Sequence, residues 1–217
     1  MNCKLVGQFV QHLEVTLLPG EDFYAEKGSV IYLEVGIEKE LSFNGSGLGR
    51  ILGAKLSGES LFILRLMNVS NIPRKVVIGS RFGLLPVKLN GETMICHRGV
   101  YVGSNNRVNV STKLSIAGLT GGMGLLLQKI QGVSTVFLDT KGTPITINLQ
   151  YGETIEVDED HIIALLNIAD HQMQSNWSLG NLLGGEGLSM MRITGPGTVY
   201  LSPSKFMPRW FNNLSWV

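Results

Sequence analysis

The histidines are the residues best suited to bind a metal ion, and their spacing argues against a cupin-type site. His12, His97, His161 and His171 never form a His-x-His pair. Residues two apart on a strand point to the same face, so such a pair lets two imidazoles bind one ion. A Gly-x-Ser-x-Gly nucleophile motif and a phosphate-binding loop are also missing. We therefore expect no cofactor and no enzymatic activity.

A run of carboxylates in the last third of the chain offers oxygen ligands for a cation. Its members are Glu156, Asp158, Glu159 and Asp160. Alternating carboxylates suit Ca²⁺, but the glycine that bends a calcium-binding loop is absent. We interpret the run as a solvated turn and expect no metal.

A glycine–glutamate pair that follows one apolar run and precedes another recurs as Gly20-Glu21, Gly91-Glu92 and Gly152-Glu153. The three glutamates would form a carboxylate triad if the copies met on a threefold axis. The simpler interpretation is structural, because glycine supplies the dihedral angles of a turn and the glutamate caps it or faces solvent. We favour the structural role.

Charge is distributed unevenly along a chain whose formal net charge is only +1. Residues 60–138 contain nine basic residues and one acidic residue, whereas residues 139–186 contain eight acidic residues and one lysine. The basic residues that we take as a possible anionic-partner or self-association surface are Arg65, Arg74, Lys75, Arg81, Lys88, Arg98 and Arg107. The acidic run is their possible counterpart.

Three interpretations of this asymmetry remain open. The two segments neutralise each other within one chain, or chains associate head-to-tail through them. Alternatively, the basic segment binds nucleic acid or anionic lipid. The basic segment has few aromatic residues, which gives base stacking little support.

The C-terminal residues 206–217 are rich in aromatic side chains, including Trp210, Phe211 and Trp216. So much apolar surface is seldom left free in water. We expect this tail to dock on its own sheet or to anchor in a neighbouring chain.

The elements that must position these residues are short strands. Ile145, Ile147 and Leu149 alternate with polar residues, the period of a half-buried strand. Glycine is abundant, at 27 of 217 residues, as expected where many strands are joined by tight turns. Hydrophobic residues make up 44%, yet the sequence shows neither an export signal nor an apolar run that could span a bilayer. We predict an all-β, cytoplasmic protein without a transmembrane segment.

A second glycine pattern supports an internal repeat. A Gly-x-Gly followed by two strands that flank a further glycine occurs three times, at Gly47/Gly49, Gly122/Gly124 and Gly185/Gly187. We predict a single domain of three diverged β-units, approximately 1–70, 71–140 and 141–205, followed by the tail. Packing around a pseudo-threefold axis, as in a double-stranded β-helix or an attenuator-like fold, would cover the apolar face of each unit.

These motifs carry a family resemblance over nearly the whole chain. The matching stretches are Val15–Tyr32, Thr120–Ala164 and Gly184–Leu201. In them the chain resembles the proteins named for altered inheritance of mitochondria, a former domain of unknown function. The resemblance implies a fold like that of the tryptophan RNA-binding attenuator protein, whose short β-units assemble into rings, and no established enzymatic activity. Some mitochondrial members are linked to inner-membrane organisation, but we see no presequence here. The attenuator's cluster of closely spaced basic residues is missing too.

We therefore expect a non-enzymatic scaffold or binding protein that acts as a homo-oligomer. One alternative is a nucleic-acid-binding module that uses the basic middle repeat. The other is a protein that binds a small molecule or a metal between repeats.

Overall fold

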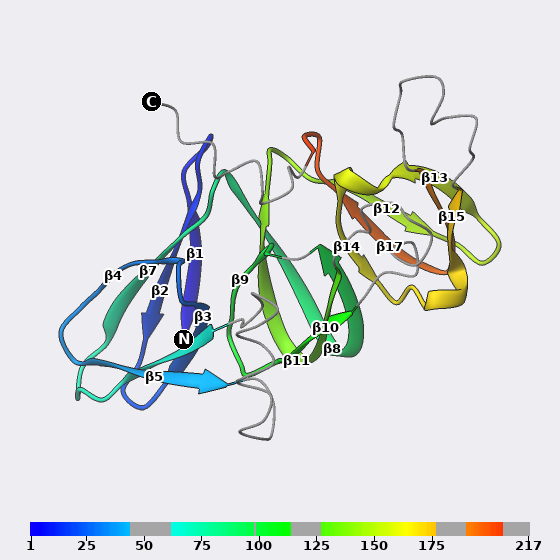
Figure 1. The fold of residues 1–217 in the computed structure, drawn as a ribbon. Coiled ribbons are helices and arrows are strands. Elements are labelled where there is room, and N and C mark those ends of the chain that lie inside the picture. Colours follow the sequence, from blue (N-terminus) through cyan, green and yellow to red (C-terminus); the bar gives the residue numbers. More distant parts are fainter. Residues whose placement is uncertain (44–61, 98, 114–126, 177–189, 206–217) are drawn as a thin grey trace, which may run out of the picture.

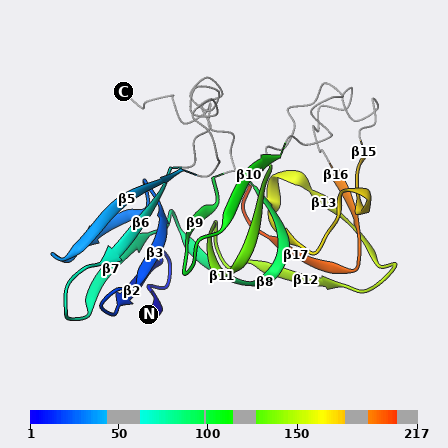
Figure 2. The same cartoon turned by 90° about the horizontal axis from the view of Figure 1, so that it is seen from below.

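In the computed structural model, residues 1–43, 62–97, 99–113, 127–176 and 190–205 are described. These residues form seventeen strands and two 3-10 helices of three residues each, which confirms the all-β class. The strands gather in three groups that follow one another in chain order (Figures 1 and 2).

The first unit contains seven strands. One sheet has the order β1-β2-β7-β4, and β3 and β5 pair with β6 on either side in a second sheet. The strands are β1 (Asn2–Val6), β2 (His12–Leu17), β3 (Asp22–Glu26), β4 (Val30–Leu33), β5 (Ile37–Phe43), β6 (Phe62–Asn68) and β7 (Arg74–Gly79).

The second unit uses fewer but longer strands, and the third returns to short ones. The second contains β8 (Gly83–His97), β9 (Tyr101–Ser104), β10 (Asn109–Lys113) and β11 (Leu127–Thr140). The third contains β12 (Ile145–Leu149), β13 (Thr154–Asp158), η2 (Glu159–His161), β14 (Ile162–Leu166), η3 (Asp170–Gln172), β15 (Met173–Asn176), β16 (Met190–Thr194) and β17 (Gly197–Leu201).

One pairing scheme recurs in the three units. In the first unit β7 pairs with β2 and β4, and β6 pairs with β3 and β5. In the third, β17 pairs with β12 and β14, and β16 pairs with β13 and β15. In the second, β11 pairs with β8 along both of its halves and also with β9 and β10. Each of the long strands β8 and β11 thus corresponds to two short strands of the other units. The two halves of β11 are separated by a bulge near Gly132.

The unit boundaries and the arrangement differ from the sequence-based expectation. Because β7 pairs with β2 and β4, the first unit extends to residue 79 rather than 70. The second then covers residues 83–140 and the third residues 145–201. The units lie in an open row, and within the described residues β4 and β13 each pair on one side only. The expected closure around a pseudo-threefold axis is therefore not seen.

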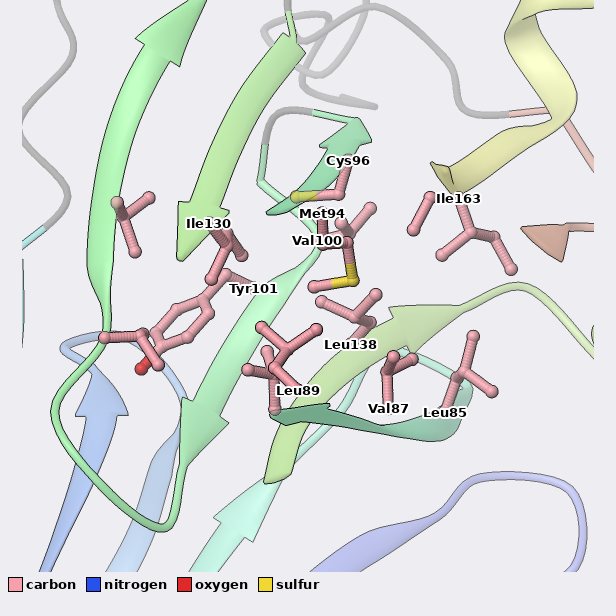
Figure 3. Close-up of a cluster of buried hydrophobic side chains, with 14 of the residues drawn as sticks. Leu85, Val87, Leu89, Met94, Cys96, Val100, Tyr101, Ile130, Leu138 and Ile163 are labelled. Carbon is pink, nitrogen blue, oxygen red and sulfur yellow. The ribbon is translucent and has the colours of Figure 1, made fainter. Parts of the chain in front are cut away.

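Neighbouring units share their cores. The core of the second unit contains Leu89, Met94, Tyr101 and Leu138 (Figure 3). Ile163 from β14 of the third unit packs into the same cluster. The other two cores likewise include side chains of the second unit. Removing a neighbouring unit would therefore expose apolar surface on the unit that remains.

Candidate self-association edges

The first and second units meet along a strand pair. Strand β3 pairs antiparallel with β9, with Tyr24 opposite Ser104 and Ala25 opposite Gly103. The approach is close, because a Cβ atom on Gly103 would lie 2.7 Å from Cε1 of Phe23. A small residue is required here to let the two units meet.

The second and third units meet in the same way. Strand β8 pairs antiparallel with β14, with Ile95 opposite Leu165 and Cys96 opposite Ala164. Counting four residues on from the repeated glutamates makes Cys96 equivalent to Ala25. The two seams therefore use equivalent strands in the same register.

A hydrogen bond found in every unit defines the strand on the other side of each seam. The backbone N–H groups of Gly79, Asp139 and Ser202 donate to the carbonyls of Ser29, Val100 and His161, at 2.6, 2.6 and 2.7 Å. Each of these carbonyl residues comes directly before a strand, so the three strands that follow, β4, β9 and β14, are equivalent. Likewise, β3, the second half of β8, and β13 are equivalent.

The third combination of these strands, β13 with β4, is not formed within the chain. Strand β4 is an open edge on which Ile31 is 60% exposed and Tyr32 is 48% exposed. The residues equivalent to Ile31 at the seams are Val102 and Ile163, and both are buried. Ala164, which is equivalent to Tyr32, is buried as well. The first unit thus presents an apolar strand that is covered in the other two.

Strand β13 is the matching open edge of the third unit. Ile155 is only partly buried, whereas its counterparts Phe23 and Met94 are completely buried. Glu156 is exposed at the same edge. Within the described residues, the row of units therefore ends in two unpaired strand edges. One is equivalent to the strand on one side of a seam, and the other to the strand on its other side.

Comparison with known proteins shows the family of this chain. Residues 3–204 match the family described as mitochondrial biogenesis AIM24. The chain belongs to the AIM24 family. It is 26% identical over 204 residues to an uncharacterized protein of Streptococcus pyogenes serotype M6, covering 87% of this chain and 79% of the relative. A crystal structure of a Streptococcus pyogenes protein superposes with a TM-score of 0.71 at 20% identity, over 94% of each chain, which shows a shared fold.

The basic residues singled out in the sequence do not belong to one unit of this AIM24 chain. Arg65, Arg74 and Lys75 lie on β6 and β7 of the first unit, not in a basic middle repeat, because β7 closes the first unit. Lys88 and Arg107 are exposed on the second unit. Arg98 lies outside the described residues.

Three of these basic side chains pair with acids close by. Arg65 Nε contacts Asp22 Oδ2 at 2.6 Å, and its Nη1 contacts Glu40 Oε2 at 3.3 Å. Lys75 Nζ lies 3.3 Å from Glu14 Oε2. Arg81 Nε lies 3.6 Å from Asp139 Oδ2, and Arg74 Nε donates to Ser70 Oγ at 3.2 Å. The charges of Arg65, Lys75 and Arg81 are therefore balanced by acidic residues that lie far from them in the sequence.

The acidic run is engaged in a similar way. Glu156 accepts from Arg192 Nη2 at 2.8 Å, across β13 and β16. Asp158 contacts Lys205 Nζ at 2.5 Å and caps η2 by accepting from the Asp160 N–H at 3.0 Å. The Glu159 side chain is buried, which differs from the solvated turn we expected. Within the described residues, no group of three His, Cys, Asp or Glu side chains is placed to hold a metal ion.

Gly20-Glu21 and Gly152-Glu153 lie on turns, whereas Gly91-Glu92 lies within β8, opposite the bulge of β11, which differs from the turn we expected there. Gly20, Gly91 and Gly152 have φ angles of +80°, +105° and +83°, the region that favours glycine. The Glu21 and Glu153 carboxylates accept from backbone N–H groups of Leu18 and Gln150, at 2.8 and 2.7 Å, and Glu92 accepts from that of Asn90. Hydrogen bonds from the N-terminal ammonium and from Leu18 lower the pKa of Glu21.

The remaining sequence candidates lie outside the described residues. They are Gly47, Gly49, Gly122, Gly124, Gly185 and Gly187, and the tail residues Trp210, Phe211 and Trp216. In the described part of this AIM24 chain, no helix has the length and apolar character needed to cross a membrane.

Proposed function

We propose that this chain is a non-enzymatic scaffold that assembles head-to-tail, with β4 of one copy pairing with β13 of the next. The observation that carries this proposal is the strand pairing used at both internal seams. Strands β4 and β13 are the equivalents of the two paired strands, and within the described residues the corresponding edge of each is open. Unpaired strand edges are templates for another chain, and a second copy offers the complementary strand.

The internal seams fix the register of the proposed pairing. In them Tyr24 lies opposite Ser104 and Ile95 opposite Leu165. The equivalent positions at the open edges are Glu156 on β13 and Leu33 on β4. We therefore place Glu156 of one copy opposite Leu33 of the next, with Val157 opposite Tyr32.

Side-chain sizes at the seams support this register. Bulky Phe23 packs on Gly103 at the first seam, and at the second seam the equivalent Met94 lies in one core cluster with Ala164. At the open edges the sizes are exchanged, because the smaller Ile155 would accompany the large Tyr32. Volume is thus kept nearly constant, as packing in a buried interface requires.

The proposed interface is heterologous, because each copy gives one kind of edge and receives the other. Such contacts produce closed rings when the rotation between copies closes, and open chains when it does not. Every copy within the assembly would have both edges paired. Assembly would thereby remove the exposed strand edges that otherwise favour aggregation.

Light scattering on the purified chain tests the proposal. We expect the wild type to have a mass of at least twice the 23.7 kDa of one chain at micromolar concentration. Ile31→Lys places a charge in the edge and should yield single chains, because burying an unpaired ammonium is costly. Val133→Lys, at a similarly exposed aliphatic residue on β11, is the matched control and should keep the assembled mass. A wild type that remains a single chain would refute the proposal.

The nucleic-acid and small-molecule alternatives stay predictions, as does the cytoplasmic location. The ion pairs of Arg65, Lys75 and Arg81 lend the nucleic-acid alternative little support. A gel-shift series with mixed RNA at low salt checks it, since binding through phosphates weakens steeply as salt rises.

A further inference from the structure

A second apolar surface lies away from the open edges, at the turn between β1 and β2. Phe9 and Val10 are 91% and 58% exposed, and Phe82, which precedes β8, is 48% exposed. We call these three residues the apolar tip. They adjoin one another, because the N–H of Gln11 donates to the carbonyl of Phe82 at 2.7 Å.

The surrounding backbone holds the apolar tip in an exposed position. Gly7 has a φ of +105°, and a Cβ atom there would lie 2.3 Å from the carbonyl oxygen of Val10. Gln11 joins this turn to the segment before β8, because its Oε1 accepts from the N–H of Leu84 at 2.8 Å and its carbonyl accepts from Ser80 Oγ at 2.6 Å. The exposure of Phe9 and Val10 is thus built into a well-bonded turn.

Positive charge accompanies the apolar tip. The Arg81 side chain, next to Phe82, is 54% exposed, whereas that of its partner Asp139 is only 7% exposed. The cation therefore faces solvent and the carboxylate faces the protein. Lys141 follows two residues after Asp139 and lies close enough to Arg81 for the two charges to interact.

The connections between units lie on the same side of the molecule as the apolar tip. Figure 1 shows the β1–β2 turn, the β7–β8 and β11–β12 connections and the end of β17 along its upper edge. In a head-to-tail assembly whose seams repeat the internal ones, this edge would face the same way in every copy.

We propose that the apolar tip inserts into the surface of a bilayer that contains anionic lipids, with Arg81 and Lys141 at the headgroups. Exposed aromatic and aliphatic side chains beside cations are suited to the boundary between acyl chains and headgroups. A second chain is a poorer fit, because the proposed pairing edges already provide that contact. One tip binds weakly, so the affinity rests on the proposed assembly, which presents several tips together.

Vesicle co-sedimentation tests this assignment. We expect the wild type to sediment with vesicles of phosphatidylcholine and phosphatidylglycerol, and less with phosphatidylcholine alone. The double variant Phe9→Ser, Val10→Ser should lose about tenfold or more in binding, because it removes most of the inserted apolar surface. Tyr151→Ser, at a site as exposed as Phe9 on the turn before β13, is the matched control and should bind like the wild type.

Three results would overturn the lipid assignment. They are a wild type that ignores both kinds of vesicle, a double variant that binds as well as the wild type, and a double variant that falls to a single chain in light scattering. The last would make the apolar tip a contact between copies. The proposed assembly fails separately, when a wild type that sediments with vesicles scatters light as a single chain in solution.

Discussion

At the scale of single residues, Gly103 shows how closely the units of this chain meet. Its position on β9 leaves no room for a side chain, because a Cβ atom would lie 2.7 Å from the Phe23 ring and 2.8 Å from the Tyr24 carbonyl oxygen. Both neighbours belong to the first unit. One methyl group at this position would therefore push two units apart.

We predict that Gly103→Ala lowers the free energy of unfolding by about 2 kcal/mol or more, the range found for overpacked cores. Gly20→Ala is the comparison, because its Cβ atom would meet nothing within 4 Å and only the positive φ angle is penalised. That variant should lose about 1 kcal/mol. Urea unfolding of both variants checks the order, and equal losses would mean that the seam is loosely packed.

Asp139, at the end of β11, is a buried acid with a perturbed ionisation. Burial raises the pKa of its carboxyl group above the ordinary value of 3.8, and hydrogen bonds and the cation of Arg81 only partly offset this. The unfolded chain therefore ionises Asp139 at lower pH than the folded chain does. The stability that this group contributes is fully present below pH 3.8 and is lost as pH rises through the folded-state pKa.

Asp139→Asn cannot ionise, but it keeps an acceptor for the N–H of Arg81, which lies 2.9 Å from Oδ1. We predict that this variant gains stability relative to the wild type as pH rises from below 3.8 through the folded-state pKa. Urea unfolding of both proteins at pH values below and above this interval measures the difference. Curves that stay parallel would contradict the prediction.

At the scale of elements, the side of β13 that faces away from β16 pairs with no strand within the described residues. The carbonyl of Glu153 accepts from the N–H of Gly195 at 2.8 Å, on the β16 side. Successive residues of a strand direct their backbone groups to alternate sides. The N–H of Glu156, three residues later, therefore points to the open edge.

This geometry allows each edge to be blocked separately. Glu156→Pro should leave the single chain folded, because proline is tolerated on the edge strand of a sheet. It blocks β13, whereas Ile31→Lys blocks β4. We predict that each variant alone stays a single chain and that an equal mixture forms dimers, because each chain then keeps one complementary edge. Light scattering of the mixture decides, and a mixture of single chains would contradict the pairing of β4 with β13.

The sequence predicted the strands better than it predicted their partners. Alternation at residues 145–149 marked β12, and Gly20-Glu21 and Gly152-Glu153 marked turns, because both signals are local. The boundary expected near residue 70 separates β7 from β2 and β4, whereas long-range pairing joins β7 to both of them. The open edges were missed because they too depend on long-range pairing. One local signal was present: Tyr32 is large, whereas the equivalent residues Gly103 and Ala164 are small.

At the scale of the whole molecule, the association that we propose would rest on strand pairing more than on charge. The sequence suggested that basic and acidic segments attract each other between chains. In the structure, Arg65, Lys75 and Arg81 pair with acids of their own chain. Those charges are therefore already balanced when copies meet.

We predict that the assembled mass changes little between low and high salt, because apolar burial and backbone hydrogen bonds are not screened as exposed ion pairs are. Light scattering at both ionic strengths measures this. Dissociation to single chains at high salt would contradict this prediction and would mean that the charged segments hold the copies together.

The most direct test of head-to-tail pairing is a disulfide placed across the proposed seam. A chain carrying Leu33→Cys is mixed with a chain carrying Glu156→Cys, both with Cys3→Ser, while Cys96 stays buried. The two new cysteines would form a hydrogen-bonded antiparallel pair with Cα atoms about 5.5 Å apart, within disulfide range. Oxidation should link two chains in the mixture, and neither chain should form this link alone. A control mixture with Glu38→Cys on β5 in place of Leu33→Cys should stay unlinked. A mixture that yields no more linked chains than this control would contradict the pairing of β4 with β13.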